Sequence, residues 1–525
     1  MLGVDAVLRY AFSQGPGRDF VSPVGPPARP ATTSFGALPD GIATDRTCPL
    51  VWGTVDLLDD TVYPQRCAAD WLSTRDRLQH ALVMAWGLQR REPSNLFNDH
   101  RSCASVRSRF PVHAFVYTDD GAWLLDPYRH GLLPVGQSSV EWPDDERRHV
   151  ALAGRYTHLP SPYGRLRGPL TELEMGIGLR ALSVALEVFG LDAELCLPDM
   201  QAGRLIARLG LEPAGDWTAP VTVAAAPPGQ EPRPAPGVST GPPSEAEAAP
   251  SRTDGDPTLT EAVAVNRTSL DLAAHHPAEA GRGKTEAIPC GIDGQRSSWS
   301  DVAWRRSAGR MPRHLAGFSG RRRGLPAAAI NDAVAWLSLP PPSPVLQEVA
   351  EHITVSVCLQ DGDEMATGWY RVRGRPAGAP VAGGATRPGA LRPGATVPAR
   401  AWLELLHPDP MLPTRLEGCY GHGLAPDVGC AVRHAAMIWM LSCDVPSLLD
   451  ATGPGGWTLA QFVTGWIAHG LCLAAAAHGL YARPNRAFDE ILLQPVVGLA
   501  PGEMVLLSVV SGTGRFVEPN LDLRT

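Results

Sequence analysis

The chain has 525 residues, of which 44% are hydrophobic, and a formal net charge of −8. A chain of this length and composition can bury about two to four ordinary domain cores. The longest basic run is Arg321–Arg323, which argues against nucleic acid as the main partner. Lys284 is the only lysine among the 46 basic residues. Any chemistry that needs a lysine, such as Schiff-base formation, would therefore depend on that residue.

Ten cysteines lie at irregular spacings and form no CxxC pair. This pattern is typical of reduced thiols in a cytoplasmic protein, and it predicts no metal site. The first twenty residues contain no basic segment followed by an apolar core. The sequence therefore predicts no export signal and a cytoplasmic location.

The first part of the chain predicts an arm followed by a globular region. Residues 1–47 are interrupted by Gly and Pro and are only weakly periodic. Apolar residues recur at helical spacing within residues 70–88, which predicts a helix there. Residues 113–117 and 122–125 alternate in polarity around a short Asp-Gly turn, which predicts a β-hairpin.

A segment rich in Pro, Gly, Ala, Ser and Glu separates two halves of the chain. It runs from about Ala226 to Gly255, and regular structure is expected to resume weakly near Leu259 and firmly at Trp299. Residues 226–298 are therefore predicted to form a flexible linker. Beyond this linker, the sequence pattern predicts a helix at residues 326–337 and a strand at residues 352–359.

Two distant stretches, residues 171–211 and 458–499, resemble each other. Several residues match at a constant offset of 289, namely Gly479 with Gly190, Leu480 with Leu191, Gly465 with Gly176 and Leu471 with Leu182. Each copy predicts a helix of small residues, a loop, a second short helix and an apolar strand, the strands lying at residues 221–226 and 504–510. The chain is therefore predicted to consist of two related halves in tandem.

The helix of the second copy, near residues 459–481, is about long and apolar enough to span a membrane. Three polar residues interrupt it: Gln461, His469 and His478. The matching upstream helix carries charged residues that lipid would accept only at high cost, namely Glu172, Glu174, Arg180 and Glu187. A buried central helix that packs against neighbours on several sides is the better prediction.

Two short segments carry residues suited to an anionic ligand. Arg305, Arg306 and Ser307 precede a Gly-containing stretch and a helix, where guanidinium and hydroxyl groups can hold a phosphate. Small residues in segment 101–111 allow backbone amides to approach a ligand, and Arg107 supplies charge together with Arg109. Each segment alone is also explained as an ordinary polar surface.

Taken with the repeat, these segments resemble the FMN-dependent nitroreductase-like fold. Within that fold they resemble the SagB-type dehydrogenases, which oxidise azoline rings in ribosomally made peptides. The family's RRS opening is similar to residues 305–307, and its PS segment before a strand is similar to residues 104–111. The family's helix with a Gly-Leu end and a following GFD loop is similar to residues 465–480 and then 486–489.

The resemblance covers most of residues 50–225 and 300–515. It implies an α+β fold in which two nitroreductase-like units, duplicated in tandem, form an intramolecular pseudo-dimer. The predicted parts are residues 1–47 as an N-terminal arm, 48–225 as a degenerate nitroreductase-like half, 226–298 as the linker, and 299–525 as the half that carries the FMN phosphate site.

In this family the flavin lies between two subunits. Here the N-terminal half keeps a PS-like segment without an RRS motif, whereas the C-terminal half keeps RRS and shows only Pro342-Ser343-Pro344 in place of the PS segment. One composite FMN site is therefore expected, its symmetric counterpart having decayed. The resemblance implies these FMN contacts: Arg305, Ser307 and Arg515 on the phosphate, Ser105, Arg107 and Arg109 from the other half, and the backbone of Arg486 and Ala487 facing the ring.

The implied reaction converts a thiazoline or oxazoline ring to a thiazole or oxazole. A hydride leaves for flavin N5, a base removes a ring proton, and dioxygen reoxidises the cofactor. The family uses a Lys-Tyr pair as the base, and nothing in this sequence matches it. Tyr420 and His422 are the candidate bases here, although a surface turn is an alternative explanation for both.

The preferred hypothesis is thus a peptide-azoline dehydrogenase of a thiopeptide-type biosynthetic pathway. Its substrate would be an azoline-containing precursor peptide, with cyclodehydratase components as further candidate partners. One alternative is a flavin-free nitroreductase-like scaffold that binds a modified peptide or a partner synthetase. A nitro- or quinone-reducing enzyme is a third hypothesis.

Overall fold

The computed structural model describes the following residues: 2–13, 42, 45–93, 99–136, 138, 141, 148–198, 202–211, 214–232, 256–275, 280–289, 292, 297–306, 320–321, 324–360, 362, 365–373, 402–420, 432–514 and 520–525. Three of the predicted site residues, Ser307, His422 and Arg515, lie outside these described residues.

Two large sheets, one for each half of the chain, form the framework of the fold, and their strands pair antiparallel. The eight-stranded sheet has the order β1 (Cys48–Pro49), β6 (Gly131–Pro134), β5 (Ala122–Asp126), β4 (Val112–Tyr117), β7 (Arg148–Gly154), β9 (Val221–Ala226), β8 (Asp192–Cys196) and β10 (Arg282–Lys284). The seven-stranded sheet has the order β11 (Gly320–Arg321), β17 (Glu503–Gly514), β15 (Met437–Asp444), β12 (Ile353–Leu359), β13 (Gly368–Val372) and β14 (Leu403–Pro408), with β16 (Tyr481–Asn485) also on β17.

We use "N-terminal half" for the eight-stranded sheet with its helices and "C-terminal half" for the seven-stranded sheet with its helices. The helices of the N-terminal half are α2 (Thr54–Asp59), α3 (Thr74–Trp86), α4 (Arg167–Val188) and α5 (Ala202–Arg208). Those of the C-terminal half are α7 (Trp299–Arg306), α8 (Ala327–Ser338), α9 (Pro344–Glu351), α10 (Leu412–Cys419), α11 (Val445–Thr452), α12 (Gly456–Ala477) and α13 (Glu490–Val497). Two further helices, α1 (Val4–Phe12) and α6 (Pro257–His275), precede and connect the halves.

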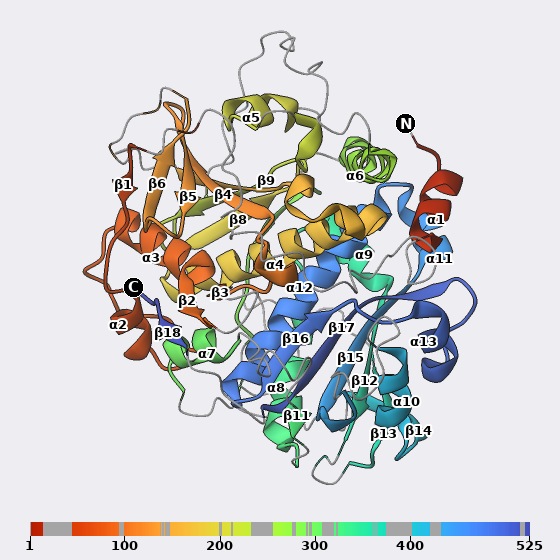
Figure 1. Ribbon diagram of the computed structural model, residues 1–525. Coiled ribbons are helices and arrows are strands. Elements are labelled where there is room, and N and C mark those ends of the chain that lie inside the picture. The colour runs from red at the N-terminus through yellow and green to blue at the C-terminus, as the bar shows by residue number, and fades with distance from the viewer. Residues whose placement is uncertain are drawn as a thin grey trace, which may run out of the picture.

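The long helices α4 and α12 lie against each other between the two sheets (Figure 1). Every residue of α12 is buried, although the helix is long and apolar enough to cross a membrane. The predicted buried central helix is therefore confirmed. Its upstream counterpart α4 is also buried along almost its whole length, with Glu187 as its exception.

Both copies of the repeat fold in the same order. The first runs α4, β8, α5 and β9, and the second runs α12, β16, α13 and β17. The prediction of a loop after each central helix was wrong, because that segment forms strand β8 in one half and β16 in the other. These short segments become strands through pairing with β9 and β17, which local sequence patterns do not reveal.

The shared Gly-Leu pairs are explained by the ends of the central helices. Gly190 and Gly479 follow α4 and α12 with φ values of 67° and 69°, a backbone conformation that favours glycine. The amide of Leu191 then donates to the carbonyl of Leu186, and that of Leu480 to Ala475. This is the Schellman type of helix end, and it stops both helices at equivalent positions.

Two predicted helices and the predicted hairpin agree with the structure, whereas the flexible linker does not agree over its whole length. The helix predicted at residues 70–88 is α3, and the helix predicted at residues 326–337 is α8. The predicted hairpin is formed by β4 and β5. Within residues 226–298, whose composition predicted a flexible linker, the structure describes α6 and the edge strand β10.

The two ends of the chain both tie the halves together. Tyr10 of α1 is buried and donates to the carbonyl of Arg165 in the N-terminal half, while α1 also packs on α11 of the C-terminal half. At the other end, β18 (Leu521–Asp522) joins a small sheet with β2 (Leu88–Arg91) and β3 (Asp99–Arg101) of the N-terminal half. The chain therefore closes back on its first half.

Candidate functional site

A buried arginine from the C-terminal half reaches the N-terminal half beside α12. Arg306, the last residue of α7, is 3% exposed, and its Nη2 donates to the carbonyl of Arg101 at 2.8 Å. Within the described part of the chain, Arg306 forms no ion pair and its Nε has no hydrogen-bond partner. Burial lowers the pKa of this guanidinium group. A buried cation without a carboxylate is costly unless an anion binds beside it.

Two further buried groups lie near Arg306. Arg101 of β3 is 9% exposed, and its Nε has no partner among the described residues. His469 on α12 is 3% exposed, and its Nδ1 also has no partner there. Burial, reinforced by the charges of Arg306 and Arg180, holds the pKa of His469 well below its usual range. We call Arg101, Arg306 and His469 the interface cluster; it offers hydrogen-bond donors from both halves to an anion.

The predicted phosphate ligand Arg305 points elsewhere. Its side chain is 42% exposed, forms an ion pair with Asp301 at 3.2 Å and approaches Ser297. On α7 the buried face carries Trp299, Val302 and Arg306, so Arg305 lies on the solvent side. The structure therefore brings Arg306, rather than its neighbour, to the contact between the halves.

The predicted PS-like segment of the N-terminal half packs against helix α4 of its own half. The amide of Val106, next to Ser105, donates to Glu174 Oε1 on α4 at 2.7 Å. Arg107 lies over the ring of Tyr163, with 5.3 Å between the guanidinium carbon and the ring centroid. The Nε of Arg109 is buried and has no partner among the described residues. This segment therefore follows directly from Arg101 of the interface cluster.

Arg486 and Ala487 lie at another point along α12. Arg486 Nη1 approaches Gln461 Oε1 at 3.3 Å, and its Nη2 pairs with Glu490 at 3.5 Å. Gln461 is completely buried, and its Nε2 has no partner within the described residues. Gln461 precedes His469 by eight residues, which corresponds to about 12 Å along a helix. Unpaired donors thus occur at two separated points on the same helix.

Tyr420, a predicted catalytic base, is not brought to this region. It is 3% exposed and lies in an apolar cluster with Phe488 and Met440, with the Tyr420 and Phe488 ring centroids 6.0 Å apart. Met440 and Ile438 of β15 face this cluster, whereas Trp439 faces the core that contains α12. Tyr420 therefore lies on the opposite face of the sheet from the central helix.

The duplicated fold has a second position, beside α4, that is equivalent to the position of the interface cluster beside α12. The chain itself fills this second position. The Pro342-Ser343-Pro344 segment lies against residues 280–289, with Val345 N donating to the carbonyl of Ala280 at 3.3 Å. A Cβ added to Gly283 would lie 1.3 Å from the carbonyl oxygen of Pro342. Backbone therefore occupies the space beside this second PS-like segment.

Residues of α4 hold the same segment from its other side. Arg180 Nη2 donates to the carbonyl of Ala287 at 3.0 Å, and Glu187 accepts from the amides of Ala287 and Ile288. Arg180 corresponds to His469 in the repeat at the offset of 289. Of these two equivalent residues, Arg180 thus binds a backbone carbonyl, while His469 has a ring nitrogen, Nδ1, without a partner in the part of the chain that the structure describes. Lys284 is exposed on β10, pairing with Glu194 in the strand register.

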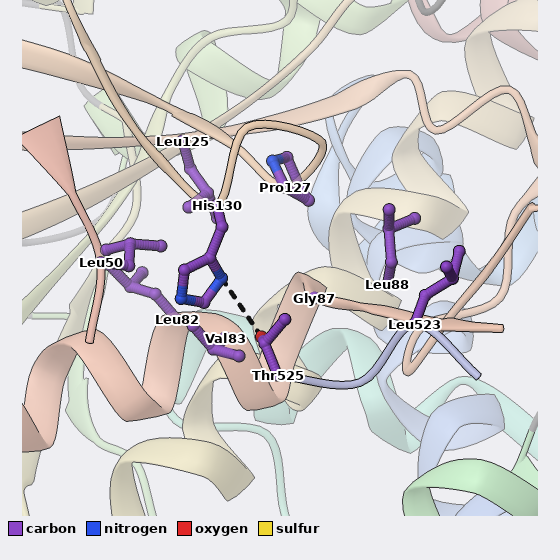
Figure 2. Close-up of a pocket in the computed structure, with 10 residues that line it drawn as sticks. All are labelled: Leu50, Leu82, Val83, Gly87, Leu88, Leu125, Pro127, His130, Leu523 and Thr525. Atoms are coloured by element: carbon purple, nitrogen blue, oxygen red, sulfur yellow. Dashed lines mark hydrogen bonds between the residues drawn. The ribbon is translucent and has the colours of Figure 1, made fainter. Parts of the chain in front are cut away.

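A separate small pocket lies beneath the last residues of the chain, 520–525, which we call the C-terminal arm (Figure 2). His130 Nδ1 and the Thr525 hydroxyl are 3.2 Å apart at its polar side. The rest of the lining is mainly apolar and comes from Leu50, Leu82, Val83, Gly87, Leu88, Leu125, Pro127 and Leu523. None of the predicted site residues that the structure describes lines this pocket.

The sequence did not single out Arg101, His469 or Glu174 as site residues, and it offered Arg306 only as part of the Arg305-Arg306-Ser307 group, without a contact of its own to FMN. The helical spacing of Trp299, Val302 and Arg306 could have indicated that Arg306 faces inward. Arg180 and His469 are polar residues at matching positions of the repeat, each in the middle of an apolar central helix. This match could have indicated that His469 belongs to a site. Nothing in the sequence alone places Arg101 beside them.

Comparisons with known proteins agree with this architecture. No family model matches the chain, and no curated protein matches it. A solved structure from Anabaena variabilis, assigned as a nitroreductase, matches with a TM-score of 0.56 and 13% sequence identity; the match covers 85% of this chain and 90% of that one.

Two other solved structures match about two-fifths of the chain. They are the E. coli microcin synthetase McbBCD complex with truncated pro-MccB17 bound (TM-score 0.28, 14% identity, 40% of this chain and 71% of that one) and a protein of Ralstonia eutropha JMP134 assigned as a nitroreductase (TM-score 0.26, 14% identity, 41% and 82%). Both TM-scores are below 0.5, whereas that of the Anabaena protein is above it.

The fold is α+β and nitroreductase-like, duplicated within one chain so that its two halves form an intramolecular pseudo-dimer. This agrees with the fold that the sequence predicted. At 13% identity, the likeness concerns the fold and leaves the activity to be argued from the site.

Proposed function

We propose that this protein is an FMN-dependent oxidoreductase that binds one flavin between its two halves. The observation that carries the proposal is the interface cluster, in which Arg101 and Arg306 are buried, form no ion pair among the described residues and each keep an Nε without a hydrogen-bond partner there. A phosphate placed there would receive charge-assisted hydrogen bonds and offset the cost of burying both cations. The unpaired Nε2 of Gln461 suits a carbonyl oxygen of a flavin ring.

In this proposal the flavin phosphate lies at Arg306 and Arg101, and its ring lies toward Gln461 and the backbone of Arg486 and Ala487. Of the predicted phosphate ligands, Ser307 and Arg515 are proposed to complete that end of the site, whereas Arg305 has no part in it because its exposed side chain pairs with Asp301. Ser105, Arg107 and Arg109 form the wall contributed by the N-terminal half. The closed counterpart at residues 280–289 supports one flavin per chain instead of two.

For the reaction, we propose oxidation of a thiazoline or oxazoline ring in a ribosomally made peptide, as the motif resemblance implies. Bound FMN would supply hydride acceptance. The chain excludes water from the surroundings of the buried helix α12, which strengthens hydrogen bonds and electrostatic interactions there. His422 keeps its predicted role as proton acceptor, whereas Tyr420 has none in this proposal because it lies on the far face of the sheet.

The direct test is to purify the full chain and measure its absorbance spectrum and the FMN released per chain. We expect a yellow protein with one FMN per chain. Incubated with an azoline-containing precursor peptide in air, it should remove two hydrogens per azoline ring without added NAD(P)H, as measured by mass spectrometry. A chain that binds no flavin under any condition would instead support a scaffold, and a requirement for NAD(P)H would favour a nitro- or quinone reductase.

Replacing the buried arginine should affect FMN binding more than replacing its exposed neighbour. Arg306→Ala removes a buried charge-assisted bond, so we expect FMN affinity to fall about 100-fold, which corresponds to about 3 kcal/mol. Arg305→Ala is the matched control and should weaken binding less than about 10-fold, because its side chain pairs with Asp301 in solvent. Fluorescence titration with FMN measures both values. Equal losses in the two variants would overturn the assignment to Arg306.

A further inference from the structure

The segment from Ser105 to Phe110 has an unusual backbone. Arg107, Ser108 and Phe110 have φ values of 51°, 53° and 47°, in the left-handed region that side chains other than glycine rarely adopt. Among the other described residues, His130 is the only one besides glycines that has a positive φ. Such a conformation persists when the surrounding structure holds it in place.

Glu174 of α4 provides that support. Its Oε1 accepts from the amide of Val106 at 2.7 Å, and its carboxyl group also interacts with the Ser105 side chain. Ser105 Oγ in turn accepts from the amide of Phe110 at 2.7 Å. One buried carboxyl group therefore fixes both ends of the strained segment and joins it to the helix at the centre of the molecule.

The repeat shows that this arrangement belongs to one half. At the offset of 289, Glu174 corresponds to Val463 on α12, which has no polar side chain. The second PS-like segment does not use a carboxylate: the Ser343 side chain instead accepts from the amide of Leu346 and begins α9. Glu174 thus distinguishes the open side of the pseudo-dimer from the side closed by residues 280–289.

We propose that Glu174 is a positioning residue that holds the left-handed segment Ser105–Phe110 against the flavin site. The inference rests on the proposed function for its ligand, since this segment is the wall that the N-terminal half contributes. Without the carboxyl group, the segment relaxes toward ordinary backbone angles. Arg107 and Arg109 then lose their place beside the interface cluster.

The proposal includes a dependence on pH. Burial raises the pKa of Glu174 to about 8, while the Val106 amide, Ser105 and Arg101 act in the opposite direction. Among the described residues, Arg101 and Cys103 are the ionisable groups with which Glu174 interacts, and both belong to its own half. Ionised Glu174 adds negative charge beside an anion site, so FMN affinity should fall as the pH rises through 8.

Three variants of the full chain test the inference. Glu174→Gln keeps an oxygen acceptor for Val106 but cannot ionise, and Glu174→Val installs the residue of the sister half. Glu172→Gln is the control, because Glu172 is equally buried on α4 and its counterpart in the repeat is Gln461. Hydrogen exchange of amides 106–110 and FMN titration at pH 6.5 and 9 are measured for each variant.

We expect Glu174→Val to increase exchange at amides 106–110 and to weaken FMN binding about 10-fold or more, while Glu174→Gln stays within about 3-fold of the parent. The parent should bind FMN more weakly at pH 9 than at pH 6.5, and Glu174→Gln should lose that dependence. Unchanged exchange in Glu174→Val overturns the inference even if FMN binds. If the parent binds no flavin, the proposed function fails, and the exchange result alone decides the role of Glu174.

Discussion

Glu172 has a buried carboxyl group on α4 next to the Tyr156 hydroxyl. The contribution of this group to the stability of the fold depends on pH. Burial raises its pKa from 4.5 to about 8. Between these values the folded chain keeps a proton that the unfolded chain releases, so the stability that this group contributes is lost as the pH rises from about 4.5 to about 8. The loss amounts to at most about 1.4 kcal/mol per pH unit.

Glu172→Gln should therefore stabilise the protein increasingly as the pH rises. A glutamine cannot ionise, and its carbonyl oxygen can still accept from Tyr156. Thermal unfolding at pH 5.5 and 7.5 should show a higher Tm for the variant, with the larger difference at pH 7.5. A difference of the same size at both pH values would show that the carboxyl group is not protonated in the folded state.

At the scale of single elements, the crossing of α4 and α12 depends on two equivalent glycines. A Cβ added at Gly176 would lie 1.8 Å from the carbonyl oxygen of Phe462, and one added at Gly465 would lie 1.9 Å from that of Leu173. Both clashes involve backbone, which cannot rotate away as a side chain can. The two helices can approach this closely only because the repeat places glycine at both positions.

Gly176→Ala and Gly465→Ala should each destabilise the fold by about 1–3 kcal/mol, since they force the helices apart. Gly418→Ala on α10 is the control, because no atom lies within 4 Å of its added Cβ. That change should stabilise the protein by about 0.5–1 kcal/mol through helix propensity. Urea unfolding curves measure all three. A neutral Gly176→Ala variant would contradict the close crossing.

At the scale of the whole molecule, the last residues of the chain contact both halves. Arg524 of the C-terminal arm donates to Ser300 and lies over Trp304 of α7, while Leu523 N donates to Gln89 in the N-terminal half. Thr525 O accepts from Val55 of α2. These contacts and the central helix pair indicate that neither sheet is independent of the other.

The two sheets should therefore unfold together. Hydrogen exchange in urea should report the same midpoint for amides of β7 and β15, which lie in different sheets. Gly176→Ala should lower both midpoints equally, because it disturbs the shared helix pair. Two separate midpoints would show that the halves are independent domains.

Much of the fold could be predicted from sequence because it depends on local patterns and on the repeat. The periodicity of residues 70–88 predicted α3, and the matched Gly-Leu pairs marked the ends of α4 and α12. Strands β8 and β16 could not be predicted in this way, because pairing with a distant strand determines their conformation. Similarly, the sequence offered both arginines of the Arg305-Arg306 pair, and only the packing of α7 decided that Arg306 is the buried one.

The sequence by itself determined that two related halves are joined in tandem and that each is built on a small-residue helix, because composition and the constant offset of 289 record these features directly. Only the tertiary structure decided that Arg101, Arg306 and His469 meet between the halves and that residues 280–289 close the equivalent position. Such meetings depend on distances between segments far apart in the chain, and no local pattern of residues encodes those distances.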